Sequence, residues 1–116
     1  MQRAIAAYVA GIAARNVGDM KRVFPSMPSD MQRNWDGLFK SVKDVEAHAS
    51  DVVLAPGGAD NGGATLSLVV TFPNPATKRP CTTTTQLRLH LARAGSSWRI
   101  ASLDQVGDAA TSAGCR

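Results

Sequence analysis

The two histidines of the chain are the residues best suited to acid–base or metal chemistry. His48 and His90 each alternate with polar neighbours, a pattern that favours surface or interface positions. Two histidines without a positioned third ligand do not indicate a zinc site, and no serine stands in the G-x-S-x-G motif of hydrolases. The glycines within residues 57–63 lack the spacing and the lysine of a phosphate loop. We therefore predict no metal, no cofactor and no catalytic residue.

The two cysteines, Cys81 and Cys115, show neither a C-x-x-C motif nor a cysteine–histidine spacing typical of zinc. They can form one disulfide or remain two unrelated thiols. A bridge would fasten residues 108–116 to the start of a strand, with a stabilisation of roughly 3–4 kcal/mol in the loop-entropy model. It would also imply an oxidising, extracytoplasmic compartment, whereas two thiols would fit the cytoplasm.

Length and composition predict one packed domain. With 116 residues and a hydrophobic fraction of 44%, the chain can bury one core but not two. The net charge of +4 comes from scattered basic residues, and neither adjacent pair, Lys21 with Arg22 or Lys78 with Arg79, is interleaved with aromatic residues. This pattern favours a solvated basic surface over a nucleic-acid site. No apolar run reaches the roughly 18 residues that cross a bilayer, so we expect no membrane contact by this segment.

The first predicted helix holds the only tyrosine of the chain. Residues 3–15 place Ile5, Tyr8, Val9 and Ile12 at helical spacing, and alanines fill much of the remainder. With isoleucines before and after it on the same face, Tyr8 is typical of a core tyrosine.

Two further helical patterns follow. Residues 17–24 continue the apolar spacing up to Pro25, which stops a helix because proline disfavours helical geometry in the residue before it. Ser29 and Gln32 fit a capping box, which predicts a third helix with Ser29 as its cap. Its apolar residues follow the pattern of one buried face: Met31, Trp35, Leu38, Phe39 and Val42.

Four segments rich in Val, Leu and Thr predict an antiparallel sheet in the rest of the chain. They span residues 45–54, 64–72, 82–92 and 98–103, and stretches of Gly, Pro, Asn and Ser separate them. Short connections make consecutive strands pair antiparallel. The third segment alternates an apolar face with a polar one, so one side of the sheet should face a core.

Three helices followed by a meander that ends in W-R-I-A-S-L resemble the nuclear transport factor 2-like superfamily, also called SnoaL-like or cystatin-like. The resemblance covers residues 1–104 as a single domain and leaves 105–116 as a C-terminal tail. It implies an α+β, cone-shaped fold, with the N-terminal helices packed in the concave face of a curved four-stranded antiparallel sheet. More narrowly, residues 4–27, 31–39 and the closing W-R-I-A-S-L are similar to C-terminal extracytoplasmic domains of some bacterial serine/threonine kinases.

The resemblance implies two kinds of function. The superfamily holds enzymes such as ketosteroid isomerase, polyketide cyclases and scytalone dehydratase, and it also holds non-catalytic binding and dimerising modules. Its isomerase-like members need a tyrosine donor, a carboxylic acid and a carboxylate base inside an apolar cone. Here Asp36 and Asp44 lie beside the third predicted helix and Asp104 ends the last strand, away from the apolar strand faces. We therefore carry no catalytic residue over from the superfamily.

The cone of such a fold often holds a pocket. Six residues are the candidates for lining it, with a filled core as the alternative: Tyr8, Trp35, Phe39, Leu87, Leu89 and Trp98. The polar face of the third strand is the candidate dimer interface, since the outer sheet surface is a common dimerisation surface in the superfamily, and solvent exposure is the alternative. Four residues define this face: Thr84, Gln86, Arg88 and His90.

These observations favour a non-catalytic domain that binds a ligand, senses a signal or binds another protein, as the extracytoplasmic appendage of a bacterial signalling protein. Its expected partners are a small apolar ligand and a second copy of the chain, without nucleic acid. The alternative is a small SnoaL-like or ketosteroid-isomerase-like enzyme, an isomerase, cyclase or dehydratase, that acts on an apolar substrate in the cone. A scaffolding subunit without a small ligand is a third hypothesis.

Overall fold

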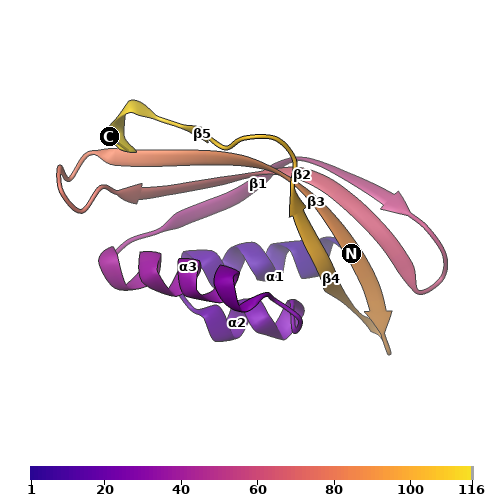
Figure 1. Ribbon diagram of the computed structural model, residues 1–116. Coiled ribbons are helices and arrows are strands. Elements are labelled where there is room, and N and C mark those ends of the chain that lie inside the picture. The colour runs from indigo at the N-terminus through magenta and orange to yellow at the C-terminus, as the bar shows by residue number, and fades with distance from the viewer. Residues whose placement is uncertain (116) are drawn as a thin grey trace.

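The chain begins with three helices and continues as an antiparallel sheet that arches over them, as the computed structural model in Figure 1 shows. Residues 1–115 are described. The helices are α1 (Gln2–Ala13), α2 (Val17–Val23) and α3 (Ser29–Ser41). The strands are β1 (Glu46–Pro56), β2 (Asn61–Pro73), β3 (Pro80–Ala94), β4 (Ser97–Gln105) and the short β5 (Ala110–Thr111), and a 3₁₀ turn, η1 (Ala113–Cys115), follows. The predicted α+β fold is confirmed, and the tail adds a fifth strand to the four that were expected.

One face of helix α1 packs into the core because its apolar residues recur at helical spacing. Ile5, Tyr8 and Ile12 are buried, and the helix packs against β1 and β4. Helix α2 crosses it closely at Gly11, where an added Cβ would lie only 2.8 Å from Cγ of Met20. Only glycine therefore allows the two helices to approach this far.

The start of α3 differs from the predicted capping box. Pro28 occupies the cap position, and Ser29 is the first helical residue. No side-chain hydrogen bond caps the helix, and the Gln32 amide Nε2 instead donates to the carbonyl oxygen of Met27 at 2.8 Å. The capping-box prediction is wrong because the helix begins one residue earlier than it requires, so that the Ser29 hydroxyl lies within the first turn.

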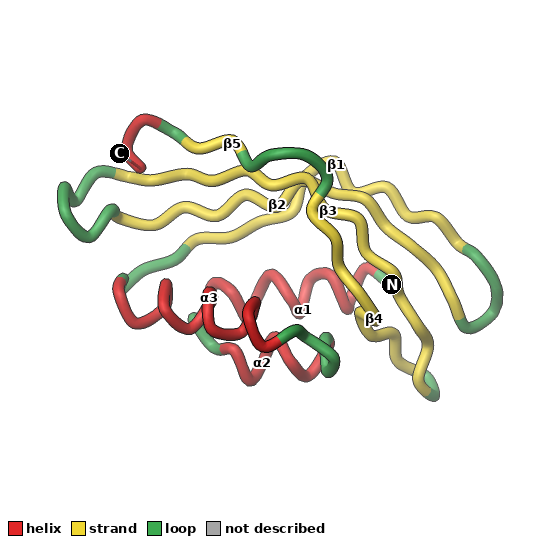
Figure 2. Tube along the Cα trace, viewed as in Figure 1, coloured by secondary structure: helices red, strands yellow, loops and turns green. Residues whose placement is uncertain are grey.

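The sheet has the order β1-β2-β3-β4, and every pairing in it is antiparallel. The β2–β3 ladder is continuous from Asn61 opposite Ala92 to Pro73 opposite Pro80. The register shifts between Ser50 and Val53 in β1 and between His90 and Leu91 in β3. Such irregularities increase bending and twist. Figure 2 shows the far ends of β3 and β4 bending toward the helix layer, which makes the sheet concave on the helix side.

The concave face of the sheet carries the apolar residues that the alternation predicted. The buried residues of this face on the two central strands include Ala64, Leu66, Leu68 and Val70 of β2 and Leu87, Leu89 and Leu91 of β3. They form one cluster with the buried faces of α1 and α2 and with Ile100 of β4. Within residues 1–115, no helix is long and apolar enough to cross a membrane.

The C-terminal segment lies along the edge of β3 that β4 leaves unpaired. Ala110 and Thr111 of β5 pair with Thr84 and Thr83, in a stretch of β3 that lies before the first residue paired with β4, Leu87. Beyond β5, the Ser112 amide donates to the Thr82 carbonyl oxygen at 2.9 Å. Within the tail expected at 105–116, Gln105 is the last residue of β4 and Ala110–Thr111 form β5, while Arg116 lies outside the described residues.

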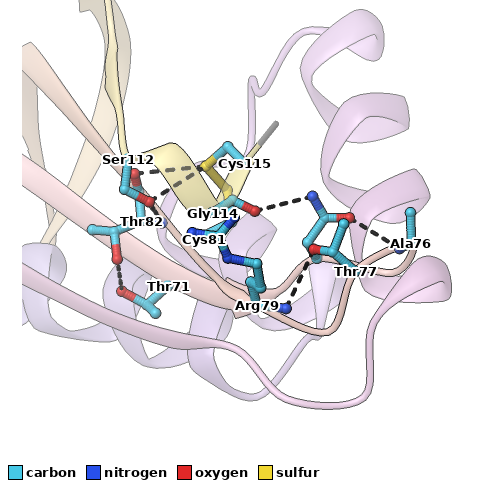
Figure 3. Close-up of a disulfide and its surroundings, with 10 residues drawn as sticks. Thr71, Ala76, Thr77, Arg79, Cys81, Thr82, Ser112, Gly114 and Cys115 are labelled. Atoms are coloured by element: carbon cyan, nitrogen blue, oxygen red, sulfur yellow. Dashed lines mark hydrogen bonds between the residues drawn. A yellow bond between two sulfur atoms is a disulfide. The ribbon is translucent and has the colours of Figure 1, made fainter.

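Cys81 and Cys115 are joined by a disulfide, with their Cα atoms 4.5 Å apart. Figure 3 shows the turn that carries Cys115 lying against Cys81 and Thr82. Gly114 packs so tightly there that an added Cβ would lie 1.8 Å from the Pro80 carbonyl oxygen. Of the two alternatives that the sequence left open, the structure has the bridged pair, which closes a loop of 34 residues.

Candidate functional site

A cavity of about 490 Å³ lies between α3 and the concave face of the sheet. From the helix side it is lined by Met31, Asn34, Trp35 and Leu38 of α3 together with Pro28, Asp30 and Tyr8. From the sheet side it is lined by Leu68, Val70 and Phe72 of β2, Thr83, Thr85 and Leu87 of β3, and Leu103 and Gln105 of β4. A cavity of this volume is in the range that holds small organic ligands.

The cavity exists because α3 stands away from the sheet. Within the described residues, the backbone of α3 packs mainly beside α2 rather than beside a strand. Phe39 and Val42, at its C-terminal end, are buried in the core, whereas Met31, Trp35 and Leu38 are only half-buried and border the cavity. Much of the apolar face predicted for this helix therefore meets an open space.

The polar groups of the lining are mostly uncharged. Thr83 and Thr85 contribute hydroxyls, and Asn34 and Gln105 contribute amides. The one carboxylate in the lining belongs to Asp30, whose side chain is 85% exposed and pairs with Arg33. Because water screens an exposed ion pair, this carboxylate places little charge inside the cavity.

Tyr8 is the buried ionisable group of the lining, with an exposed fraction of 4%. Burial raises the pKa of its hydroxyl to about 12, and the neighbouring Trp35 side chain acts in the opposite direction. The Tyr8 ring also packs near Phe24, with ring centroids 6.3 Å apart. The hydroxyl is therefore neutral near pH 7 and can donate a hydrogen bond.

Solved structures with a similar fold share little sequence with the chain. A proposed scytalone dehydratase from Novosphingobium aromaticivorans matches 96% of this chain with 83% of its own, at 10% identity and a TM-score of 0.77. A nuclear transport factor 2-like superfamily protein from Salmonella enterica serovar Typhimurium matches 90% with 86% of its own, at 15% identity and a TM-score of 0.74.

The chain has the nuclear transport factor 2-like fold.

A third structure of this fold, the hexachlorocyclohexane dehydrochlorinase LinA-type3 from Novosphingobium barchaimii, matches 97% of the chain with 88% of its own, at 12% identity and a TM-score of 0.72. No protein-family model and no curated protein sequence matches the chain. At these identities the likeness concerns the fold, and proteins with a nuclear transport factor 2-like fold include enzymes as well as non-catalytic domains.

The six residues expected to line the cone occupy three different environments in this nuclear transport factor 2-like fold. Tyr8, Trp35 and Leu87 line the cavity. Phe39 and Leu89 are buried in the core beside it. Trp98 lies on β4 at a separate depression near the N-terminus of α1.

Sequence reasoning did not single out several polar and apolar lining residues. Thr83 and Thr85 are the clearest of these, since the alternation of β3 places them on the same face as Leu87. That alternation was the available signal. Phe72 and Leu103 had no comparable signal, because their place at the cavity depends on how β2 and β4 curve around α3.

The two histidines lie apart from the cavity of the nuclear transport factor 2-like cone. His48 borders a separate groove of about 410 Å³ between α1 and the edge strand β1, whose other lining residues are mostly alanine, isoleucine and valine. His90 is exposed on β3. In the part of the chain that the structure describes, no group of three histidine, cysteine, aspartate or glutamate residues could hold a metal ion.

The candidate dimer residues share the convex face of β3. Arg88 and His90 are exposed. The Gln86 side chain accepts a hydrogen bond from Ser67 Oγ at 2.9 Å, and Thr84 pairs with Ala110 of β5. The C-terminal segment thus extends the sheet beside Thr84, and a homodimer formed by this face stays a prediction.

Proposed function

We propose that the chain is a non-catalytic binding module for a small, neutral and mainly apolar molecule held in the cavity between α3 and the sheet. The composition of the lining carries this proposal. Aliphatic and aromatic side chains make up most of it, while hydroxyls and amides are placed where they can orient a ligand. A charged ligand would lose its hydration without gaining a buried counter-charge, because the one lining carboxylate is exposed and paired.

Ligand-dependent melting tests the proposal. We expect neutral compounds of suitable size, such as steroids and polycyclic aromatic alcohols, to raise the melting temperature, and carboxylated analogues to raise it less. In Trp98→Phe protein the remaining indole, Trp35, should report the same binding by fluorescence, since it lines the cavity.

A variant that fills the cavity provides the specific test. Thr85 points into the cavity, whereas Thr65 is exposed on the neighbouring strand β2. Thr85→Phe should abolish ligand-dependent stabilisation, and Thr65→Phe should keep it. Equal responses of the two variants, or no stabilisation of the unaltered protein by any neutral compound, would count against the cavity as the binding site.

A second candidate function is a small isomerase-like, cyclase-like or dehydratase-like enzyme, and Tyr8 is the observation that favours it. Tyr8 lines an apolar cavity and its hydroxyl is neutral near pH 7, as a donor to a developing oxyanion has to be. Asp30 is the carboxylate available at the same cavity as a base. Exchange of α-deuterons from a cyclic ketone, followed by NMR, tests this function. Exchange that depends on the protein and is lost in both Tyr8→Phe and Asp30→Asn would establish the enzyme over the binding module.

The disulfide between Cys81 and Cys115 supports an extracytoplasmic location for the module, because such bridges persist in oxidising compartments. We propose that the module is the outward-facing appendage of a bacterial signalling protein. Thiol labelling of the protein in intact cells with a membrane-impermeant alkylating reagent, with and without a reducing pretreatment, tests the location. We expect labelling only after reduction. No labelling even after reduction would contradict the location, and labelling without reduction would contradict the bridge.

We also propose that the chain forms a homodimer through the convex face of β3. Arg88 and His90 present polar groups there, beyond the stretch of β3 that pairs with β5. Sedimentation velocity should show a dimer that Arg88→Glu weakens, whereas Arg22→Glu, a charge reversal at an exposed residue of α2, should leave it intact. A monomer across micromolar concentrations would contradict the dimer.

A further inference from the structure

Arg15 joins the end of α1 to the end of α3. It follows the C-cap of α1 and has a φ of 54°, the left-handed region that non-glycine residues rarely adopt. This conformation accompanies a guanidinium group whose Nη1 atom donates to the carbonyl oxygens of Phe39 at 3.2 Å and Val42 at 2.7 Å. Both acceptors belong to the last turn of α3, where carbonyls lack partners within the helix and where a positive charge is favoured.

These two hydrogen bonds join the backbone at the end of α3 to Arg15, and in the middle of α3 the Trp35 side chain interacts with the Tyr8 hydroxyl. Within residues 1–115, the other hydrogen bonds and ion pairs of residues 28–42 are local: Gln32 bonds to Met27 and Pro28, Asp30 pairs with Arg33, Asp36 pairs with Lys40, and Ser41 and Val42 bond to Leu38. The C-terminal end of the helix is also held by the buried Phe39 and Val42. The rest of the helix borders the cavity, and its apolar side chains there, Met31, Trp35 and Leu38, are only half-buried.

The other walls of the cavity are far more firmly attached. The β2–β3 wall is paired along its whole length, and the face of α1 that carries Tyr8 is buried against the core. Opening either wall would break many backbone hydrogen bonds or expose a large apolar area. Moving α3 would break the two Arg15 hydrogen bonds and the contact of Trp35 with the Tyr8 hydroxyl, and of its apolar residues only Phe39 and Val42 are buried.

We propose that α3 is the wall of the cavity that moves to admit a ligand, and that Arg15 is the positioning residue that holds it closed. The part of this proposal that concerns a ligand rests on the binding function proposed above. Arg15 does not line the cavity, and both of its hydrogen bonds to α3 are to backbone carbonyl oxygens. Its loss should therefore change how fast the cavity opens more than it changes the chemistry of the lining.

Two substitutions separate this role from a general contribution to folding. Arg15→Met keeps the length of the side chain but removes both donors, and Arg15→Lys restores one positively charged donor. Arg22→Met is the matched control, because Arg22 is an exposed arginine on α2 that pairs only with Asp19. The probe is N-phenyl-1-naphthylamine, a neutral apolar dye whose fluorescence rises in an apolar site, and two readouts are followed: stopped-flow binding rates and hydrogen exchange of the backbone amides.

We expect Arg15→Met to speed both association and dissociation of the dye by about tenfold, since a hydrogen bond to a charged group shifts an equilibrium by at least that factor. Amides of α3 should exchange faster by a similar factor, while those of β2 and β3 keep their protection. Arg15→Lys should recover part of both effects, and Arg22→Met should match the unaltered protein.

Unchanged exchange in α3 of folded Arg15→Met protein would overturn the proposal, as would acceleration spread evenly over α3 and the sheet. If Arg15→Met does not fold, the same comparison is made with Arg15→Lys, and the same outcomes decide. Failure of the dye to bind the unaltered protein would contradict the proposed binding function, and the exchange pattern would still decide whether Arg15 holds α3.

Discussion

The indole of Trp35 stacks on the ring of Phe39, with ring centroids 5.7 Å apart and an interplanar angle of 28°. Trp35 is half-buried and lines the cavity, whereas Phe39 is buried in the core. The pair lies at consecutive turns of α3, so that one ring supports the other. The shape of the cavity wall therefore depends on a residue that does not line the cavity.

Phe39→Ala should lower the free energy of unfolding by about 3–5 kcal/mol, because it removes a buried aromatic side chain. It should also shift the emission of Trp35 to longer wavelength in Trp98→Phe protein, since the indole loses its support. Urea denaturation and steady-state fluorescence measure the two effects. Leu89→Ala is the control: Leu89 is equally part of the core but neither lines the cavity nor stacks on Trp35, so its loss should destabilise the protein without moving the emission.

The ionisation of Tyr8 should give a single absorbance transition with its midpoint at high pH, because the chain has one tyrosine. The near-ultraviolet absorbance of tyrosinate should appear with a midpoint near pH 12 in the folded protein, against about 10 in urea. Because the pKa of Tyr8 is higher in the folded than in the unfolded protein, its ionisation does not change the free energy of unfolding below pH 10. Between pH 10 and pH 12 it lowers this free energy by about 1.4 kcal/mol per pH unit. In Tyr8→Phe this loss should be absent. A folded-state midpoint near 10 would mean that the hydroxyl is open to water.

Removal of the disulfide should lower the stability and release the C-terminal segment. For a loop of this length the entropic model gives about 3–4 kcal/mol. In a Cys81→Ser, Cys115→Ser double variant, amides of Thr111 and Ser112 should lose protection against hydrogen exchange, while those of β2 keep theirs. Chemical denaturation with and without a reducing agent should show the same difference in the unaltered protein. Protection that persists in the double variant would show that backbone pairing with β3 alone holds β5.

Gly37→Ala should stabilise the protein by about 0.5–1 kcal/mol, because glycine is a poor helix former and an added Cβ there meets nothing within 4 Å. Thermal denaturation measures the gain. Gly114→Ala provides the contrast, since its Cβ would collide with the Pro80 carbonyl oxygen and should detach the turn that carries Cys115. A loss of stability in Gly37→Ala would imply that α3 needs its present flexibility or packs differently.

The helices and strands could be predicted from the sequence because the signals that specify them are local. The spacing of Ile5, Tyr8 and Ile12 and the alternation along β3 each place apolar side chains on one face, whatever the rest of the chain does. The four long strands, their antiparallel order and the side of the sheet that faces the core followed from these patterns. The start of α3 did not, since Pro28 competes with Ser29 for the cap.

What only the tertiary structure decided depends on residues far apart in the chain. Whether the apolar face of α3 meets a filled core or a cavity depends on the curvature of β2 and β3 and on the distance at which Phe39, Val42 and Arg15 hold the helix. Arg15 is separated from its two acceptors, Phe39 and Val42, by 24 and 27 residues in the sequence. The bridged cysteines, Cys81 and Cys115, are separated by 34 residues. Periodicity reports which side chains point inward. It carries no information on whether another side chain, a solvent-filled space or a partner strand lies opposite them, because that is settled only when all the elements pack together.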